Sequence, residues 1–269
     1  MPTTIHLVRH AQGIHNLCPE NHKYRDPDLT ELGHQQCANL KSLFPDHGKV
    51  RYLIASPLRR TIYTALESFT PFDPSSPAAQ KTKGSPPVIA TPLLQEVSTN
   101  PCDYGSEVSK LRQEFGEKAD LSRVTDDDDW LNKDKGSPWA PDYTRLRTRA
   151  MQARTWFREL SGGADTDVHI VVVTHGGFLH FLTDDFDGLS ETYGTGWNNT
   201  ECRSYHFADL TGKDPEAHLK ETNASWRKRR GSQIPLTESE HMEMRAVVKE
   251  VLRTEFAPWN ESDEVAVEA

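Results

Sequence analysis

The sequence predicts an α/β protein built on a doubly wound, mostly parallel sheet with helices on both faces. Three short apolar runs, at 5–8, 50–55 and 168–173, have the length and continuous hydrophobicity of buried strands. Segments with apolar residues at helical spacing, 31–44 and 143–160, lie between them. The 269 residues are enough for one large domain or two small ones with a sizeable core.

Composition and charge disfavour several classes of protein for this sequence. The net charge of −9 disfavours nucleic acid and anionic membrane as partners, and no apolar run reaches the length of a membrane span. The N-terminus leads directly into a strand, so we expect no secretory signal and a cytoplasmic location, with the nucleus as a second location. The four cysteines form no CxxC pair, which favours free thiols over a zinc knuckle or a redox motif.

The first strand ends in Arg9-His10, a cation and an imidazole at the position where open α/β sheets bind ligands. Taken alone, the pair is more simply read as two ordinary polar residues, because short motifs match by chance. Thr30 is a favourable N-cap for the helix over 31–44. Gly33 in the first turn of that helix indicates close packing on the sheet.

The strand at 50–55 leads into SPLRRTIYTALESF. We expect Ser56 to cap the next helix and Pro57 to be its first residue. Arg60 then takes the fourth helical position and leans back toward the end of the strand, where a helix N-terminus favours an anion. Arg59 lies about 100° around the helix and is expected to face elsewhere.

A proline- and serine-rich loop at 70–87 precedes a third predicted strand at 88–94, although Pro92 disfavours strand structure at its end. Glu96 follows that strand, in a position equivalent to that of His10, although an isolated glutamate is usually a surface residue. We expect the irregular segment 97–142 to be an insertion over the site, with a helix near 106–116. Its acidic run, Asp126–Asp129, is more simply a solvated loop than a metal site.

The strand at 168–173 is followed by His175, Gly176 and Gly177, which begin another helix. The glycines are expected to let main-chain N–H groups approach a ligand at the helix start. The remaining predictions concern the C-terminal third of the chain. They are a Gly- and aromatic-rich loop at 189–201, an edge strand at 202–207, a solvated basic loop at 227–230, a helix at 237–256 and a flexible acidic tail.

The strand ends can converge on one edge of the sheet, and the residues there fit phosphoryl transfer through a phosphohistidine. Neutral His10 would attack phosphorus, provided that its other ring nitrogen is bonded to an acceptor such as a main-chain carbonyl. Glu96 would protonate the leaving alkoxide and then activate water, with Asp103 and Glu107 as the next candidates. Cations should lower the pKa of Glu96, which predicts an acidic pH optimum if bound phosphate does not cancel their field. The expected ligands of the phosphate oxygens are Arg9, Arg60, Asn16 and His175.

Five segments of the sequence form a specific set of motifs. They are LVRHAQGIHN (7–16), DPDLTELGHQQ (26–36), SPLRRTIYTA (56–65), LLQE (93–96) and VVVTHGGF (171–178). Together they resemble the histidine phosphatase superfamily, in its phosphoglycerate-mutase-like branch. The resemblance places the pocket arginine at Arg60 rather than Arg59, and the second histidine at His175. It also matches Asn16 and the acid/base residue, Glu96.

The resemblance implies a three-layer α/β/α sandwich over 1–269 as a single domain, with no obligatory metal or cofactor. The family contains mutases, bisphosphatases, small-metabolite phosphatases and members that act on proteins. Ala11 and Gln12 depart from the usual mutase motif, and no clear set of basic residues would grip a phosphoglycerate carboxylate. Water is therefore the expected acceptor and a small phosphorylated metabolite the expected substrate, for a monomer or a homodimer. A mutase-type transferase, a different reaction in the same pocket, and phosphate binding without catalysis remain alternatives.

Overall fold

The computed structural model describes residues 2–70, 87–189 and 195–255, and strands and helices alternate along most of these ranges. The strands are β1 (Thr4–Arg9), β2 (Val50–Ala55), β3 (Val88–Ala90), β4 (Ala119–Asp120), β5 (His169–Thr174), β6 (Cys202–Phe207) and β7 (Leu219–Glu221). The α-helices are α1 (Glu31–Leu43), α2 (Arg59–Phe69), α3 (Val108–Phe115), α4 (Tyr143–Leu160), α5 (Gly176–Thr183), α6 (Asn223–Arg230) and α7 (Glu238–Glu255).

The strands of the described residues form one sheet in the order β4-β3-β2-β5-β1-β6-β7. The first five in this order run parallel, whereas β6 is antiparallel to both β1 and β7. At the centre, Val172 of β5 lies opposite Leu7 of β1 on one side and Ile54 of β2 on the other. Because parallel strands point the same way, the carboxyl ends of β1, β2 and β5 meet at one edge of the sheet.

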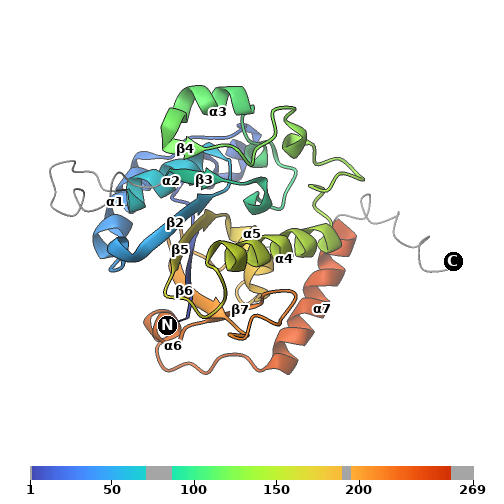
Figure 1. Cartoon of the computed structure of the whole chain (residues 1–269). Helices are drawn as coiled ribbons and strands as arrows, with labels where there is room; N and C mark the ends of the chain where they lie inside the picture. Colours follow the sequence, from blue (N-terminus) through green and yellow to red (C-terminus); the bar gives the residue numbers. More distant parts are fainter. Residues whose placement is uncertain (1, 71–86, 190–194, 256–269) are drawn as a thin grey trace.

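Helices cover both faces of the sheet, which confirms the expected three-layer α/β/α sandwich (Figure 1). Alternate residues of β5 point to opposite faces, as in any strand. Ile170 and Val172 pack in one core with residues of α4 and α5, and Val171 and Val173 pack in the other with residues of α1, α2 and α3. The central strands are thus buried on both sides, which accounts for their continuous apolar runs.

The start of α1 agrees with the prediction, but Gly33 has a different reason to be glycine. The Gly33 N–H donates to Thr30 Oγ1 over 3.0 Å, so Thr30 is the N-cap. A β-carbon on Gly33 would lie 2.2 Å from the main-chain oxygen of Gln12. The glycine therefore allows the helix to approach the loop that follows β1, rather than the sheet itself.

Three predicted features differ from the structure. The strand at 88–94 ends early, at Ala90, because Pro92 begins a short 3-10 helix. The segment 202–207 is a strand but not an edge strand, since β7 pairs with its outer side. The basic cluster at 227–230 belongs to α6 rather than to a loop.

Some predictions fall partly or wholly outside the described residues. These are the loop at 70–87, the loop at 189–201, the last residue of the helix at 237–256, and the acidic tail. The four cysteines are free thiols, as predicted. Among the described residues, no helix combines the length and the apolar character needed to cross a membrane.

Candidate active site

The carboxyl ends of β1, β2 and β5 bring three polar residues together. Main-chain hydrogen bonds continue the parallel pairing past the strand ends. The His10 N–H donates to the Thr174 carbonyl over 2.9 Å, and the Ser56 N–H donates to the Val173 carbonyl over 3.1 Å. His10, Ser56 and His175 each follow directly after a strand, so they lie next to one another. The ring centroids of His10 and His175 are 5.2 Å apart.

His10 is buried, and the main chain fixes its tautomer. Its Nδ1 lies 2.7 Å from the Ala11 carbonyl, which can only accept, so Nδ1 carries the proton and Nε2 keeps its lone pair. Burial, followed by the charges of Arg60, His15 and Arg9, holds the pKa of His10 well below its usual value. A neutral imidazole with a free Nε2 is the form that can attack phosphorus.

Arg60 is the second residue of α2, not the fourth as predicted, and only 1% of its surface is exposed. Its guanidinium donates to the Cys102 carbonyl over 2.7 Å and to the Asp103 carboxylate over 2.9 Å. A third bond, over 3.0 Å, goes to Nδ1 of His175. Arg60 is therefore held by both the edge of the sheet and the segment 97–142.

The start of α2 corrects the predicted capping. The helix begins at Arg59 rather than Pro57, and the side chain of Ser56 does not cap it. Ser56 Oγ is instead bonded to Nε2 of His175 over 2.9 Å. The carboxylate of Asp26, which comes from a distant loop, accepts the Arg59 N–H over 2.9 Å. A long-range contact thus takes the place of the local cap and leaves Ser56 in the site.

His175 has both ring nitrogens engaged inside the protein. Nδ1 accepts from Arg60, so the proton lies on Nε2, which donates to Ser56. Burial and the charge of Arg60 hold the pKa of His175 well below its usual value, and the ring is neutral. In this arrangement His175 orients Arg60 and packs against His10, whereas the sequence predicted a direct ligand of phosphate.

Glu96 lies at the start of α5. Its Oε1 accepts the N–H groups of Val97 and Phe178, each over 2.9 Å, and its Oε2 accepts the Gly177 N–H over 3.1 Å. A β-carbon on Gly177 would lie 2.7 Å from Oε1, so glycine is needed for this approach. The prediction that the glycines open the helix start to a ligand is therefore corrected at Gly177, because the Glu96 carboxylate takes that N–H group.

The surroundings of Glu96 also determine its pKa. Burial and the nearby charge of Asp103 raise the pKa of Glu96, although the N–H donors and Arg60 favour its ionised form. The predicted lowering by cations is thus outweighed in the structure. Of the two reserve acids, Asp103 is buried beside Arg60, and Glu107 is exposed.

The loop after His10 contains a histidine that the sequence analysis did not single out. The centroid of the His15 ring lies 5.3 Å from that of His10. Burial, Arg60 and Arg9 lower the pKa of His15 to about 2. Its position next to Asn16 in the first motif was the available signal. The side-chain oxygen of Asn16 accepts the Gly13 N–H over 3.0 Å and closes this loop.

Two further contacts join the site to the segment before β6. The guanidinium of Arg9 donates to the Trp197 carbonyl. The side-chain amide of Asn199 donates to the His10 carbonyl over 2.9 Å. A β-carbon on Gly176 would lie 2.4 Å from Thr195 Oγ1, so this segment also packs on the start of α5. The predicted 189–201 loop therefore contacts the site through its described part.

Lys133 is a buried cation behind the site, and no motif pointed to it. Its ammonium donates to the main-chain carbonyls of Ser98, Asp103 and Glu96 over 2.8, 2.9 and 3.2 Å. Burial lowers the pKa of Lys133 to about 8. These bonds hold the main chain at Glu96 and at Asp103, the partner of Arg60.

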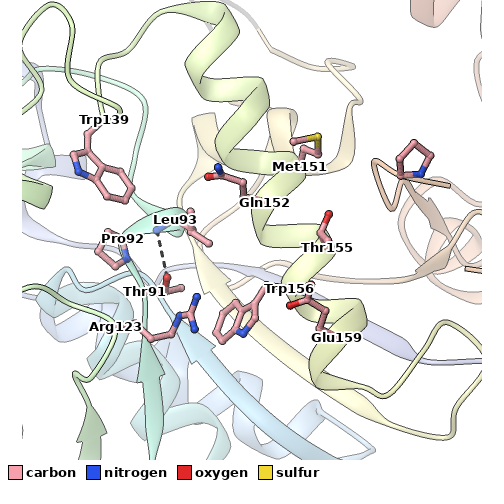
Figure 2. Close-up of a pocket in the computed structure, with 11 residues that line it drawn as sticks. Thr91, Pro92, Leu93, Arg123, Trp139, Met151, Gln152, Thr155, Trp156 and Glu159 are labelled. Carbon is pink, nitrogen blue, oxygen red and sulfur yellow. Dashed lines mark hydrogen bonds between the residues drawn. The ribbon is translucent and has the colours of Figure 1, made fainter. Parts of the chain in front are cut away.

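A separate cavity of about 590 Å³ lies between the end of β3 and α4 (Figure 2). Figure 2 shows Trp139 and Trp156 on its two sides, with Arg123 beside Trp156 at 4.1 Å from the ring centroid. The charged residues among the described ones that line it are Arg123 and Glu159, and none of the predicted site residues is among them. The candidate chemistry therefore belongs to the histidine cluster and not to this cavity.

Comparison with known proteins identifies the family of this chain. A model of the histidine phosphatase superfamily (branch 1) matches residues 5–213. A phosphoglycerate mutase-like protein of Arabidopsis thaliana is 31% identical over 242 residues, which cover 77% of this chain and 84% of the relative. A probable phosphatase of Schizosaccharomyces pombe is 30% identical over 115 residues, 42% of this chain and 49% of that protein.

A solved structure shares the fold. It is the crystal structure of the ecdysone phosphate phosphatase from Bombix mori in complex with tungstate, with a TM-score of 0.50 and 15% sequence identity. The match covers 89% of this chain and 99% of that one. The chain belongs to branch 1 of the histidine phosphatase superfamily.

Proposed function

We propose that this protein hydrolyses phosphomonoesters through a phosphohistidine on His10. The observation that supports this most is a set of buried nitrogen atoms around the ring. Eight buried side-chain nitrogen or oxygen atoms of the described residues have no hydrogen-bond partner, and three of them belong to the neighbours of His10: Arg9 Nε, His15 Nδ1 and Arg60 Nε. Buried polar atoms are normally paired, so such atoms call for an explanation. An anion with several oxygen acceptors beside His10 would pair with them.

The reaction uses a neutral imidazole at His10 and a carboxylic acid at Glu96, whose pKa is raised by burial and by Asp103. Nε2 of neutral His10 forms a bond to phosphorus while the ester oxygen leaves, and the carboxylic acid of Glu96 gives that oxygen its proton. The resulting Glu96 carboxylate then takes a proton from water as the water attacks phosphorus. The phosphorus–nitrogen bond breaks, phosphate leaves, and His10 and Glu96 return to their starting forms. Arg9 and Arg60 stabilise the charge on the other three oxygens.

The burial of the site supports a small substrate. Only 2% of the His10 surface and none of the His175 surface is exposed. The segment 97–142 contacts Arg60 through the carboxylate of Asp103. A phosphate on a flexible small molecule can enter such a site more readily than one on a folded protein. We therefore infer a small phosphorylated metabolite as the substrate, and the segment 97–142 as a determinant of its choice.

The test is hydrolysis of 4-nitrophenyl phosphate, followed by a panel of phosphorylated metabolites, with and without a chelator. We expect turnover that survives the chelator and is blocked by vanadate or tungstate, because the proposed ligands of phosphate are protein groups. Complete loss with the chelator, restored by a divalent ion, would overturn the mechanism. Transfer of phosphate between two positions of a metabolite, faster than its release, would favour the mutase alternative.

A folded protein that binds vanadate but turns over no phosphomonoester would point to binding without catalysis. His10→Ala is the control for a contaminating phosphatase, because it should remove the activity while Arg60 and Glu96 stay in place. Equal activity in this variant and in the wild type would exclude His10 as the nucleophile.

A further inference from the structure

A second pair of histidines lies on the same two strands, away from the carboxyl edge of the sheet. His6 is in β1, and His169 is the first residue of β5. The ring of His6 packs against Phe44 with centroids 4.9 Å apart, and Asp46 follows in the same loop after α1. His6, His169 and Asp46 line a groove of about 870 Å³, whose walls include residues of α1 and α6.

The donor atoms of these three side chains are close enough to share an ion. One donor atom from each residue lies within 4.8 Å of the other two. Nε2 of His6 and Nδ1 of His169 are 3.0 Å apart, and the rings are tilted by 35° with centroids 5.1 Å apart. Two imidazole nitrogens at about 2.0–2.1 Å from a tetrahedral zinc ion are roughly 3.3 Å apart. A shift of a few tenths of an ångström would therefore bring the two nitrogens to this separation, and the Asp46 carboxylate, within 4.8 Å, would turn toward the ion to complete the site.

We propose that His6, His169 and Asp46 bind a divalent transition-metal ion, for which Zn²⁺ is the best fit. Two imidazole nitrogens and one carboxylate oxygen are donors that zinc accepts, and three protein ligands leave a fourth position for water. Calcium and magnesium prefer sites made of oxygen alone, so they fit this donor set poorly.

The protons of the two rings allow such an ion to bind without any proton leaving the protein. With no ion, one of the two facing nitrogens donates to the other. With an ion, both lone pairs point at the metal, and each ring carries its proton on its other nitrogen. For His6 that nitrogen is Nδ1, which lies 2.9 Å from Ser204 Oγ. Hydrogen bonds of this kind fix the orientation of metal-ligating histidines.

The groove also meets a further requirement of a metal site, because it gives an ion a path from solvent to the three side chains. Because His6 precedes His10 by four residues of β1, roughly 13 Å at strand spacing, the ion would lie outside the phosphate site. The proposal is therefore independent of the proposed function.

A substitution at Lys49 is expected to strengthen metal binding, whereas substitutions of the ligands should weaken it. Its ammonium lies 2.8 Å from the Asp46 carboxylate, and its side chain is 58% exposed. It therefore competes with an ion for Asp46 and repels a cation in the groove. Lys49→Gln should tighten metal binding, whereas Asp46→Asn at the same place should weaken it.

The experiment is a calorimetric titration of Zn²⁺ into the purified full chain after treatment with a chelator, supported by the visible absorption of Co²⁺ bound in its place. We expect one ion per chain, and a rise in the unfolding temperature on binding. His169→Gln and Asp46→Asn should each weaken binding by about tenfold or more, because each changes a ligand, and loss of a group that only supports a ligand already costs about tenfold. Lys49→Gln should strengthen it by about twofold to fivefold, as the loss of a partly screened repulsion predicts.

His218→Gln is the matched control, because His218 is a half-exposed histidine beside two carboxylates, Asp214 at 2.9 Å and Glu216 at 3.4 Å. It should leave Zn²⁺ binding unchanged. Loss of binding in this variant, or equal affinity of the wild type, His169→Gln and Asp46→Asn, would overturn the proposal. If His169→Gln does not fold, the two surface substitutions still decide, since weaker binding in Lys49→Gln or unchanged binding in Asp46→Asn contradicts it.

Discussion

The two histidine pairs on β1 and β5 place the same residue type in opposite electrostatic surroundings. His10 and His175 follow the carboxyl ends of the strands, where the nearby charges are guanidinium groups. His6 and His169 lie farther back on the same strands, within reach of the Asp46 carboxylate. The first pair therefore lies beside guanidinium groups, whereas the second lies beside a carboxylate that is itself paired with Lys49.

Burial lowers the pKa of all four histidines, so the direction of the pKa shift does not distinguish the two pairs. The charged side chains next to each pair do distinguish them. Guanidinium groups prepare a site for an anion such as phosphate, and a carboxylate prepares one for a metal cation. A buried histidine pair is thus interpreted most safely from the charged side chains around it.

The largest expected effect is that of His10→Ala. It should reduce kcat by more than about 10⁴-fold, as does the loss of a nucleophile in other enzymes that use covalent catalysis. It should also abolish a quenched phosphoenzyme label that is acid-labile and base-stable, as expected for a phosphoramidate. Rapid quenching with a radiolabelled substrate measures both. His34→Ala, at an exposed histidine paired with Glu67, should leave turnover and labelling intact. An acid-stable label on serine or aspartate contradicts the assignment.

The next effect separates two adjacent arginines. Arg60→Ala should lower kcat/KM by about 10²- to 10³-fold, the range for loss of a buried group that stabilises transition-state charge. Arg59→Ala should change it by less than about threefold, because Arg59 pairs with Glu114 and Asp28 rather than with the histidines. Steady-state kinetics with 4-nitrophenyl phosphate checks both variants. Similar losses in the two would mean that α2 as a whole, and not the Arg60 guanidinium, supports the site.

Glu96→Gln should have an effect that depends on the leaving group. An alkoxide must be protonated as it leaves, whereas a nitrophenolate is stable without a proton. Phosphoenzyme formation from an alkyl phosphate should therefore slow by about 10²- to 10⁴-fold, and from the nitrophenyl ester far less. Single-turnover measurements on both esters provide the comparison. Equal slowing would make Glu96 a positioning residue and direct attention to Asp103.

The pH dependence of that step follows from the direction of the Glu96 pKa shift. The acid works in its protonated form, and burial with Asp103 raises its pKa. The rate with an alkyl phosphate should stay high at low pH and fall as the pH rises through the raised pKa, above the usual range of glutamate. This fall should disappear in Glu96→Gln, which has no titrating group at that position.

Local sequence patterns predicted the elements that have local causes. The buried strands, the Thr30 cap and the convergence of His10, Arg60 and His175 follow from apolar runs, capping chemistry and parallel topology. These features depend on residues close in sequence or on a general property of α/β sheets. The fold class was therefore accessible from the amino-acid sequence alone.

The parts that could not be predicted depend on contacts between distant segments. From the sequence, Ser56 is an ordinary N-cap candidate for α2. In the structure the Asp26 carboxylate accepts the N–H of Arg59 at the start of α2, and the Ser56 hydroxyl is bonded to His175 instead. Lys133 has no motif, because the hydrogen bonds that hold its ammonium at the site go to main-chain carbonyls. The raised pKa of Glu96 depends on burial and on Asp103, which no spacing rule brings beside it.

The smallest expected effect compares a glycine in the first turn of α1 with a glycine in the 3-10 helix that follows α1, His47–Lys49. Gly33 lies against the Gln12 carbonyl, in the loop that follows His10. Gly48 comes two residues after Asp46, and a β-carbon there would have no described atom within 4 Å. Gly33→Ala gains about 1 kcal/mol of helix propensity but must relieve a contact of 2.2 Å with main chain, at roughly 1–3 kcal/mol.

The net result should be a loss of about 1 kcal/mol in the free energy of unfolding for Gly33→Ala, with a lower kcat because the loop after His10 moves. Gly48→Ala should stay within about 0.5 kcal/mol of the wild type and keep kcat, because its new methyl group meets open space. Urea denaturation and steady-state kinetics on the two variants give both quantities. A Gly33→Ala protein that is more stable and fully active would show that the loop after His10 can move away from the helix without loss of stability or activity. The position of His10 would then depend on the sheet alone, through its bond to Thr174, and not on the packing of α1.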